Sequence, residues 1–184
     1  MNYLVPRNYG WKKTFNCYCK HVRILILIFC FWVSSLFADQ HILEQENFEA
    51  WQFTCVEEQS QKLCDLRELV FDSNTNEVVS YLSITINPEA LTQMQIAFPH
   101  AVNLKSPVRL QIDDRDPLEL GYAYCNQSAC FVAEIIAENF INLFKSGNQL
   151  SLKVLLLDNR EATITYSLAG FTAGYDRLNL AVNS

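Results

Sequence analysis

The side chains best placed to form covalent links in this sequence are four cysteines, Cys55, Cys64, Cys125 and Cys130. Four cysteines allow three pairings, and an even number of them is typical of a disulfide-stabilised domain in an oxidising compartment. Pairs 55–64 and 125–130 would close loops of about ten and six residues, which suits the ends of hairpin strands. The spacing alone leaves all three pairings open.

Redox catalysis and metal binding are the alternatives for these cysteines. Neither pair has the C-x-x-C spacing of a thioredoxin-type couple, because Cys125 and Cys130 enclose Asn-Gln-Ser-Ala. Zinc bound by four thiolates is disfavoured because closely spaced C-x-x-C pairs are absent. We therefore predict structural disulfides, no metal and no cofactor, and keep a redox or chaperone role at Cys125 and Cys130 as the alternative.

Other groups capable of chemistry are few. His41 and His100 are the histidines after residue 38, and we expect both to be surface or turn residues. Asp113, Asp114 and Asp116 form a compact carboxylate group, but the spacing of a calcium-binding EF-hand loop is absent and a solvated turn is expected. Neither G-x-S-x-G nor H-E-x-x-H occurs. The sequence therefore predicts a protein without catalytic activity.

Two pairs of glutamates could act as acid/base groups, and several aromatic residues could bind a ligand. Glu57 and Glu58 are expected on opposite faces of a strand, and Glu134 with Glu138 on the exposed side of a helix start. The aromatic residues that could line a pocket, and that we expect in the core instead, are Trp51, Tyr122, Tyr124, Phe131 and Phe171. The sequence alone does not assign any binding residue.

The first 38 residues have the layout of a secretory signal peptide. A basic stretch precedes the apolar run ILILIFCFWVSSLF at residues 24–37, and Ala38 follows it. A helix of this length spans roughly 21 Å, which is shorter than a hydrocarbon core of about 30 Å. We predict a cleaved signal at residues 1–38, with an uncleaved anchor as the alternative, and a folded domain at residues 39–184. The leader also contains the three remaining cysteines, Cys17, Cys19 and Cys30.

The charge distribution supports the same division. The chain carries 14 basic and 20 acidic side chains, a formal net charge of −6. Five basic residues and no acidic ones precede residue 39, so residues 39–184 carry −11. An acidic domain lacks the basic surface that phosphate neutralisation requires, which argues against nucleic acid as a partner. We expect a periplasmic, secreted or cell-surface protein without an integral membrane span once the leader is removed.

Short strands and two helices are expected to position these groups. Apolar and polar residues alternate at 51–55, 82–86, 93–98 and 108–113, and further strands are expected at 118–125, 130–136, 149–157 and 161–168. Helices are expected at 137–145 and around 171–178. Helices are missing between most strands, so a doubly wound α/β fold is excluded. The pattern predicts a mainly β fold, a single antiparallel sandwich or open-barrel-like domain.

Five motifs follow one another along residues 51–178. They are Trp51-x3-Cys55, Cys64-Asp65-Leu66, AFPHAVNLKSPVRLQIDD at 97–114, Tyr122-x2-Cys125-x4-Cys130 and SLAGF at 167–171. This combination resembles the invasion-associated locus B family of exported bacterial proteins. The chain departs from the family pattern at His100, Ala101 and Ala129, where the corresponding segments often have a glycine. These departures concern local turn geometry.

The resemblance implies a periplasmic or surface-associated protein with two local disulfides, linked in some host-associated bacteria to entry into host cells. It supplies no catalytic residues, so only Cys55, Cys64, Cys125 and Cys130 are carried over, as structural positions. Family analogy does not supply a binding site. We therefore expect a non-catalytic binding protein with an unidentified protein partner in the envelope or on a host surface; envelope maintenance is a further alternative.

Overall fold

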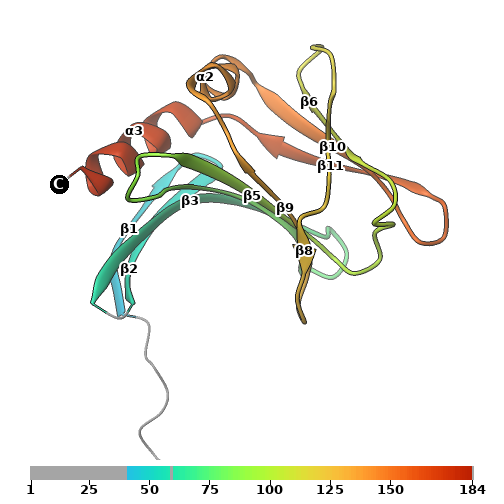
Figure 1. Ribbon diagram of the computed structural model, residues 1–184, viewed down its shortest axis with the longest axis horizontal. Helices are drawn as coiled ribbons and strands as arrows, with labels where there is room; N and C mark the ends of the chain where they lie inside the picture. Colours follow the sequence, from blue (N-terminus) through green and yellow to red (C-terminus); the bar gives the residue numbers. More distant parts are fainter. Residues whose placement is uncertain (1–40, 59, 184) are drawn as a thin grey trace, which may run out of the picture. The chain divides into compact units, whose positions relative to one another are not determined.

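The computed structural model describes residues 41–58 and 60–183, so the expected leader lies outside the described part of the chain. Two antiparallel sheets and two helices make up this part (Figure 1). The sheets do not close into a barrel, and the prediction of a mainly β fold with two helices is confirmed. Within the same residues, no helix has the length and apolar character needed to span a bilayer.

The larger sheet contains seven strands: β1 (His41–Phe48), β2 (Trp51–Glu58), β3 (Gln61–Phe71), β4 (Val78–Ile86), β5 (Thr92–Phe98), β8 (Tyr124–Cys125) and β9 (Cys130–Ile135). The smaller sheet contains four: β6 (Val108–Ile112), β7 (Leu118–Leu120), β10 (Gln149–Leu155) and β11 (Glu161–Ser167). The helices are α2 (Glu138–Ser146) and α3 (Phe171–Val182). Neighbouring strands follow the orders β1-β2-β3-β4-β5-β9-β8 and β11-β10-β6-β7.

The core lies on one face of the larger sheet. Alternate side chains of its strands point inward, and Trp51, Phe53, Leu66, Ile84 and Ile96 are all fully or almost fully buried. Both helices and the smaller sheet lie on this inner face, as Figure 1 shows. The opposite, outer face of the larger sheet is covered by none of the described helices and strands.

Helix α3 is preceded by a glycine that no other residue could replace without strain. Gly170 has a φ of 87°, and a Cβ atom there would lie 2.1 Å from the carbonyl oxygen of Phe48. Farther along α3, Arg177 forms ion pairs with Glu44 and Glu46 of β1. Charged side chains on the inner side of β1 are thus neutralised by the helix.

The helix predictions are confirmed, with small differences at the ends. Helix α2 begins and ends one residue later than expected, whereas α3 continues to Val182. The longer α3 is explained by Ala181, which lies beyond the expected end and is buried against the core.

The expected continuous strand at 118–125 is wrong. Its first part, β7, pairs with β6 in the smaller sheet, whereas its last part, β8, pairs with β9 in the larger one. Gly121 lies in the crossing between the two sheets, and open space surrounds the position of its absent side chain. A run of alternating residues does not reveal that the chain changes sheet within it.

Candidate functional site

The four cysteines form two disulfides between neighbouring strands. Cys55 of β2 lies opposite Cys64 of β3, with a Cα–Cα distance of 4.1 Å. Cys125 of β8 lies opposite Cys130 of β9, with a Cα–Cα distance of 3.9 Å. Directly opposed residues of an antiparallel pair are close enough for such a link. The structure thus selects one of the three possible pairings, and the two local disulfides implied by the resemblance are formed.

His100 supports the turn that joins β8 to β9. Its Nε2 lies 2.8 Å from the carbonyl oxygen of Asn126. The Asn126 side-chain oxygen accepts N–H bonds from Ser128 and Ala129, which closes the turn locally. His100 is therefore an exposed turn residue that braces the Cys125–Cys130 hairpin.

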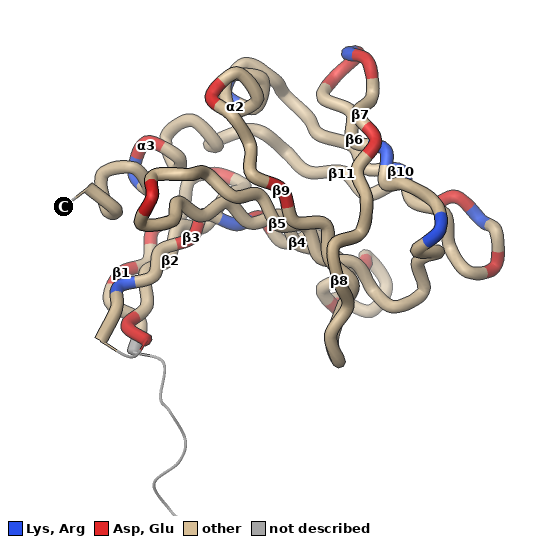
Figure 2. The backbone as a smooth tube through the Cα atoms, viewed as in Figure 1, with Lys and Arg blue, Asp and Glu red and all other residues tan. Residues whose placement is uncertain are grey.

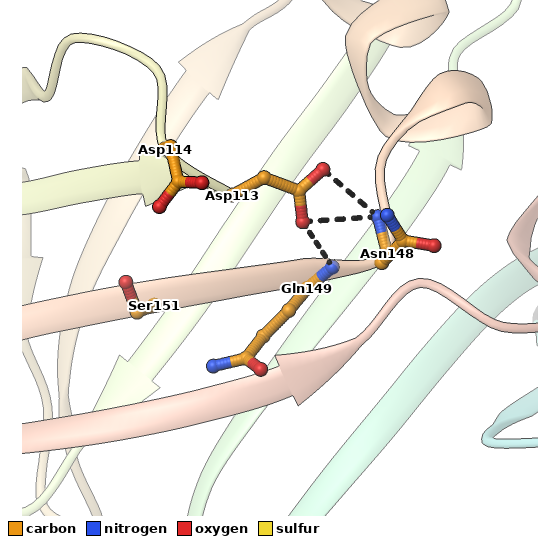
Figure 3. A pocket seen from close by; sticks show the side chains of 5 residues that line it. All are labelled: Asp113, Asp114, Asn148, Gln149 and Ser151. Atoms are coloured by element: carbon orange, nitrogen blue, oxygen red, sulfur yellow. Dashed lines mark hydrogen bonds between the residues drawn. The ribbon is translucent and has the colours of Figure 1, made fainter.

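Asp113 connects the turn after β6 to the start of β10 (Figure 3). Its carboxylate accepts N–H bonds from Asn148 at 3.1 and 3.2 Å and from Gln149 at 3.0 Å. These groups, with Asp114 and Ser151, line a surface depression of about 380 Å³. In residues 41–58 and 60–183, no three His, Cys, Asp or Glu side chains are grouped so as to hold a metal ion.

The two glutamate pairs do not form a site. Glu57 and Glu58 are exposed near the end of β2. Glu134 is wrongly expected at a helix start, because it lies in β9 while Glu138 lies in the first turn of α2. The apolar run before α2 belongs to a strand, and helical periodicity begins only after it.

Glu68 is a buried acidic residue that no sequence pattern indicates. It lies in β3 with its side chain turned into the core, and 9% of the residue is exposed. Its Oε1 accepts the N–H of Ser167 at 3.0 Å, while Oε2 is buried and has no hydrogen-bond partner. Burial raises the pKa of the Glu68 carboxyl to about 7, and the bond from Ser167 opposes this rise.

Glu68 belongs to a group of contacts that attach the smaller sheet to the larger one. The Trp51 indole donates to the carbonyl oxygen of Ser167 at 2.9 Å, so both backbone groups of Ser167 are held by side chains of the larger sheet. The Tyr166 hydroxyl bonds to Ser80 Oγ, and burial raises the pKa of Tyr166 far above its usual range. These groups clamp the edge strand β11, which is a structural task.

The aromatic residues named as core candidates divide into two groups. Trp51 and Phe171 lie in the core and meet edge to face, with ring centroids 5.0 Å apart, and Tyr122 is half-buried. The expectation is wrong for Tyr124, which is 47% exposed on the outer face of the larger sheet. Phe131 is buried on that same face, because the Tyr124 ring stacks on it at 4.8 Å.

Strand register places Tyr124 and Phe131 in a row of side chains that crosses the outer face. Leu69, Tyr81, Ala97, Phe131 and Tyr124 lie side by side on β3, β4, β5, β9 and β8. We call these five residues the aromatic row. Both of its ends are exposed, while its middle is covered by the neighbouring side chains.

Two parallel rows beside the aromatic row consist mainly of amides, hydroxyls and small groups. One contains Gln52, Arg67, Ser83, Gln95 and Ala133; the other contains Thr54, Asp65, Thr85, Gln93 and Ile135. We call these ten residues the neutral rows, because their two charged members, Asp65 and Arg67, form an ion pair. The strands β4, β5 and β8 contain no charged residue, and Figure 2 shows them tan along their length.

Hydrogen bonds connect the aromatic row to the neutral rows. The Gln95 amide donates to the Tyr124 hydroxyl at 2.7 Å, and the Tyr81 hydroxyl donates to the other atom of that amide group, Oε1, at 3.5 Å. One glutamine thus positions two phenol groups from strands β4 and β8. The outer face can stack against a flat apolar group and exchange hydrogen bonds beside it.

Comparison with known proteins places the chain in a family. Residues 51–179 match the family model described as "Invasion associated locus B (IalB) protein". The chain belongs to the invasion-associated locus B family. Invasion protein B of Bartonella bacilliformis is 25% identical over 138 residues, which cover 72% of this chain and 73% of that protein.

The invasion-associated locus B fold is also seen in a solved relative. The crystal structure of invasion associated protein B from Bartonella henselae matches with a TM-score of 0.68 and 22% identity, covering 75% of this chain and 96% of that one. The matched family region runs from the start of β2 into α3, so it includes both disulfides and the aromatic row. The resemblance drawn from the sequence motifs is therefore confirmed.

Proposed function

We propose that this invasion-associated locus B protein is exported and acts by binding a partner rather than by catalysis. The observation that carries the proposal is the outer face of the larger sheet. No described element covers it, and it combines a stacked aromatic pair with neutral hydrogen-bonding side chains. Exposed aromatic residues on an uncovered surface are typical of interaction sites.

Export is supported by the leader pattern and by the disulfides. The proposed signal peptide is residues 1–38, and the proposed mature domain is residues 39–184. Disulfides persist in oxidising compartments, which agrees with a periplasmic, secreted or cell-surface location.

Mass spectrometry of the protein from fractionated native cells tests this location. We expect a mature chain that begins near Asp39, absent from the cytoplasmic fraction, with both cystines detected after digestion without reduction. A cytoplasmic protein that retains its leader and has free thiols would contradict export.

The names of the relatives connect the family to invasion, and we extend this role to the present chain as a binding step in entry into host cells. The test compares a deletion strain with a strain that carries Leu69→Asp on the exposed end of the aromatic row. We expect both strains to enter cultured cells less efficiently while their envelopes resist detergent normally. A detergent-sensitive envelope in the deletion strain, with entry lost in proportion, would favour envelope maintenance instead.

Thiol–disulfide exchange is the second candidate, because the Cys125 side of the Cys125–Cys130 disulfide is exposed. Reactive cysteines are accessible and easily reduced, whereas structural cystines resist reduction. Alkylation before and after mild reduction separates the two roles. Reduction of Cys125–Cys130 under conditions that leave Cys55–Cys64 intact, with reductase activity toward an unfolded disulfide substrate, would favour exchange.

A further inference from the structure

We propose that the outer face of the larger sheet binds an uncharged oligosaccharide chain, with the Tyr124 ring as the platform on which one sugar ring stacks. This inference rests on the binding function proposed above and names the class of ligand for that surface. Three features of the face support it: a positioned aromatic ring, neighbouring amides and hydroxyls, and the absence of unpaired charge within the rows.

The Tyr124 ring is exposed and already held in place. It stacks on Phe131 with an angle of 22° between the rings, and its hydroxyl accepts the bond from Gln95. Nearly half of the residue remains accessible at the same time. The C–H groups on one side of a pyranose ring suit the negative face of an aromatic ring, and a ring held in advance loses little freedom on binding.

The neighbouring side chains match the hydroxyl groups at the edge of a sugar. Gln93, exposed on β5, and Thr85, half-buried on β4, lie beside Gln95 on the same face. Amides and hydroxyls both donate and accept hydrogen bonds, as sugar hydroxyls do. Arg67 and Asp65 add a charged donor and acceptor that neutralise each other.

The charge of the face selects a neutral ligand. Residues 39–184 carry a net charge of −11, yet the charged members of the neutral rows are paired and the aromatic row has none. A basic peptide would gain little here, and an anionic lipid, nucleic acid or acidic glycan would meet an acidic molecule without a basic patch on this face. An uncharged chain meets no such penalty.

The size of the face fits an extended chain rather than a single sugar. The aromatic row crosses five adjacent strands. Adjacent strands lie about 4.8 Å apart, so the row is roughly 19 Å long. Several linked sugar rings can lie along this length, with Tyr124 at one end and Leu69 at the other.

A printed glycan array that holds neutral, sialylated and sulfated oligosaccharides tests the ligand class, followed by calorimetric titration with chitotetraose and maltotetraose. The protein used is the disulfide-bonded domain secreted with its own leader. We expect binding to neutral glycans, at least tenfold weaker in Tyr124→Ala and largely retained in Tyr124→Phe, which keeps the ring. Raising the salt concentration should change the affinity little, because no ion pairs form with the ligand.

Leu157→Ala provides the matched control, since Leu157 is 67% exposed on the turn between β10 and β11, in the smaller sheet. Its affinity for neutral glycans should equal that of the unmodified protein. Equal loss in this variant and in Tyr124→Ala would overturn the assignment, as would binding confined to charged glycans. Urea unfolding of each variant identifies any loss that arises from an altered fold.

The experiments test the ligand class and the proposed binding function independently. If no neutral glycan binds but Tyr124→Ala still reduces entry into host cells, the oligosaccharide assignment is wrong and the binding function stands. If neither glycan binding nor entry depends on the outer face, both are wrong.

Discussion

Among the described residues, Glu68 is the one acidic or basic side chain that is buried. It is buried at the contact between the two sheets, where one oxygen accepts a backbone N–H bond and the other has no partner. Burial raises the free energy of the ionised carboxylate much more than that of the neutral carboxylic acid. Protonation of one residue is therefore linked to the stability of the sheet contact.

The stability of the protein should depend on pH through Glu68. The folded state holds the Glu68 proton up to about pH 7, whereas the unfolded chain releases it near pH 4.5. The contribution to the free energy of unfolding is fully present below pH 4.5 and is lost as pH rises through about 7. One pKa unit corresponds to 1.36 kcal/mol, so the loss is about 3 kcal/mol. Urea unfolding at several pH values between 4.5 and 8 measures it.

Glu68→Gln is the variant that isolates this effect, because it stays neutral at every pH and keeps an oxygen for the Ser167 N–H. We expect Glu68→Gln to be more stable than the unmodified protein at pH 8, with the difference shrinking or reversing at pH 5. Glu89→Gln, at an exposed turn position, should keep the original pH dependence. A Glu68→Gln profile parallel to that of the unmodified protein would show that Glu68 is not the responsible group.

At the scale of elements, the sequence predicts strands well where one face is apolar and the other polar. The strands β4, β5, β6 and β10 follow this rule. Alternation of apolar and polar residues does not predict β1 or β3, because β1 carries Glu44 and Glu46 on its inner side and β3 carries Leu69 and Phe71 on its outer side. Both departures have tertiary causes: α3 supplies a cation to β1, and the exposed apolar groups of β3 flank the candidate interaction face.

The start of α3 depends on Gly170. Gly170→Ala should lower the free energy of unfolding by about 2 kcal/mol or more, because the added methyl group meets the Phe48 carbonyl and the backbone is left-handed. Gly121→Ala is the control, since nothing lies within 4 Å of its Cβ position. Thermal unfolding of both variants checks this, and equal effects would mean that the close approach at Phe48 relaxes without cost.

The two disulfides should differ in their contribution. Loop-closure entropy predicts roughly 2–3 kcal/mol for each. Cys55, Cys64 and Cys130 are buried and Cys125 is exposed, so replacing the first pair by alanine removes two buried sulfur atoms from the core, whereas replacing the second pair removes one. We expect Cys55→Ala/Cys64→Ala to be less stable than Cys125→Ala/Cys130→Ala in urea unfolding. The reverse order would show that the β8–β9 hairpin contributes more than its position at the sheet edge suggests.

At the scale of the whole molecule, the chain combines a basic leader pattern with an acidic domain that contains two disulfides. Proteins destined for an oxidising compartment form their disulfides after export. We therefore expect that a protein kept in the cytoplasm would also have unpaired cysteines.

Deletion of residues 24–37 should keep the protein in the cytoplasm, with reduced cysteines and lowered abundance, because it removes the apolar segment that we propose directs export. Fractionation and thiol alkylation measure both effects. Cys17→Ser/Cys19→Ser is the control within the leader, and it should leave export unchanged. If the deletion variant still reaches the periplasm, residues 24–37 are not the export signal.

The sequence by itself determined the β-rich class, the two helices, the even cysteine count of residues 39–184 and the family, because each depends on local periodicity, composition or motif order. Only the tertiary structure decided the disulfide pairing, the split of residues 118–125 between two sheets, the burial of Glu68 and the assembly of the aromatic row. Each of these depends on the register between strands far apart in the sequence. A shift of one residue in that register would turn every outer side chain inward, so the candidate site exists only in the folded sheet.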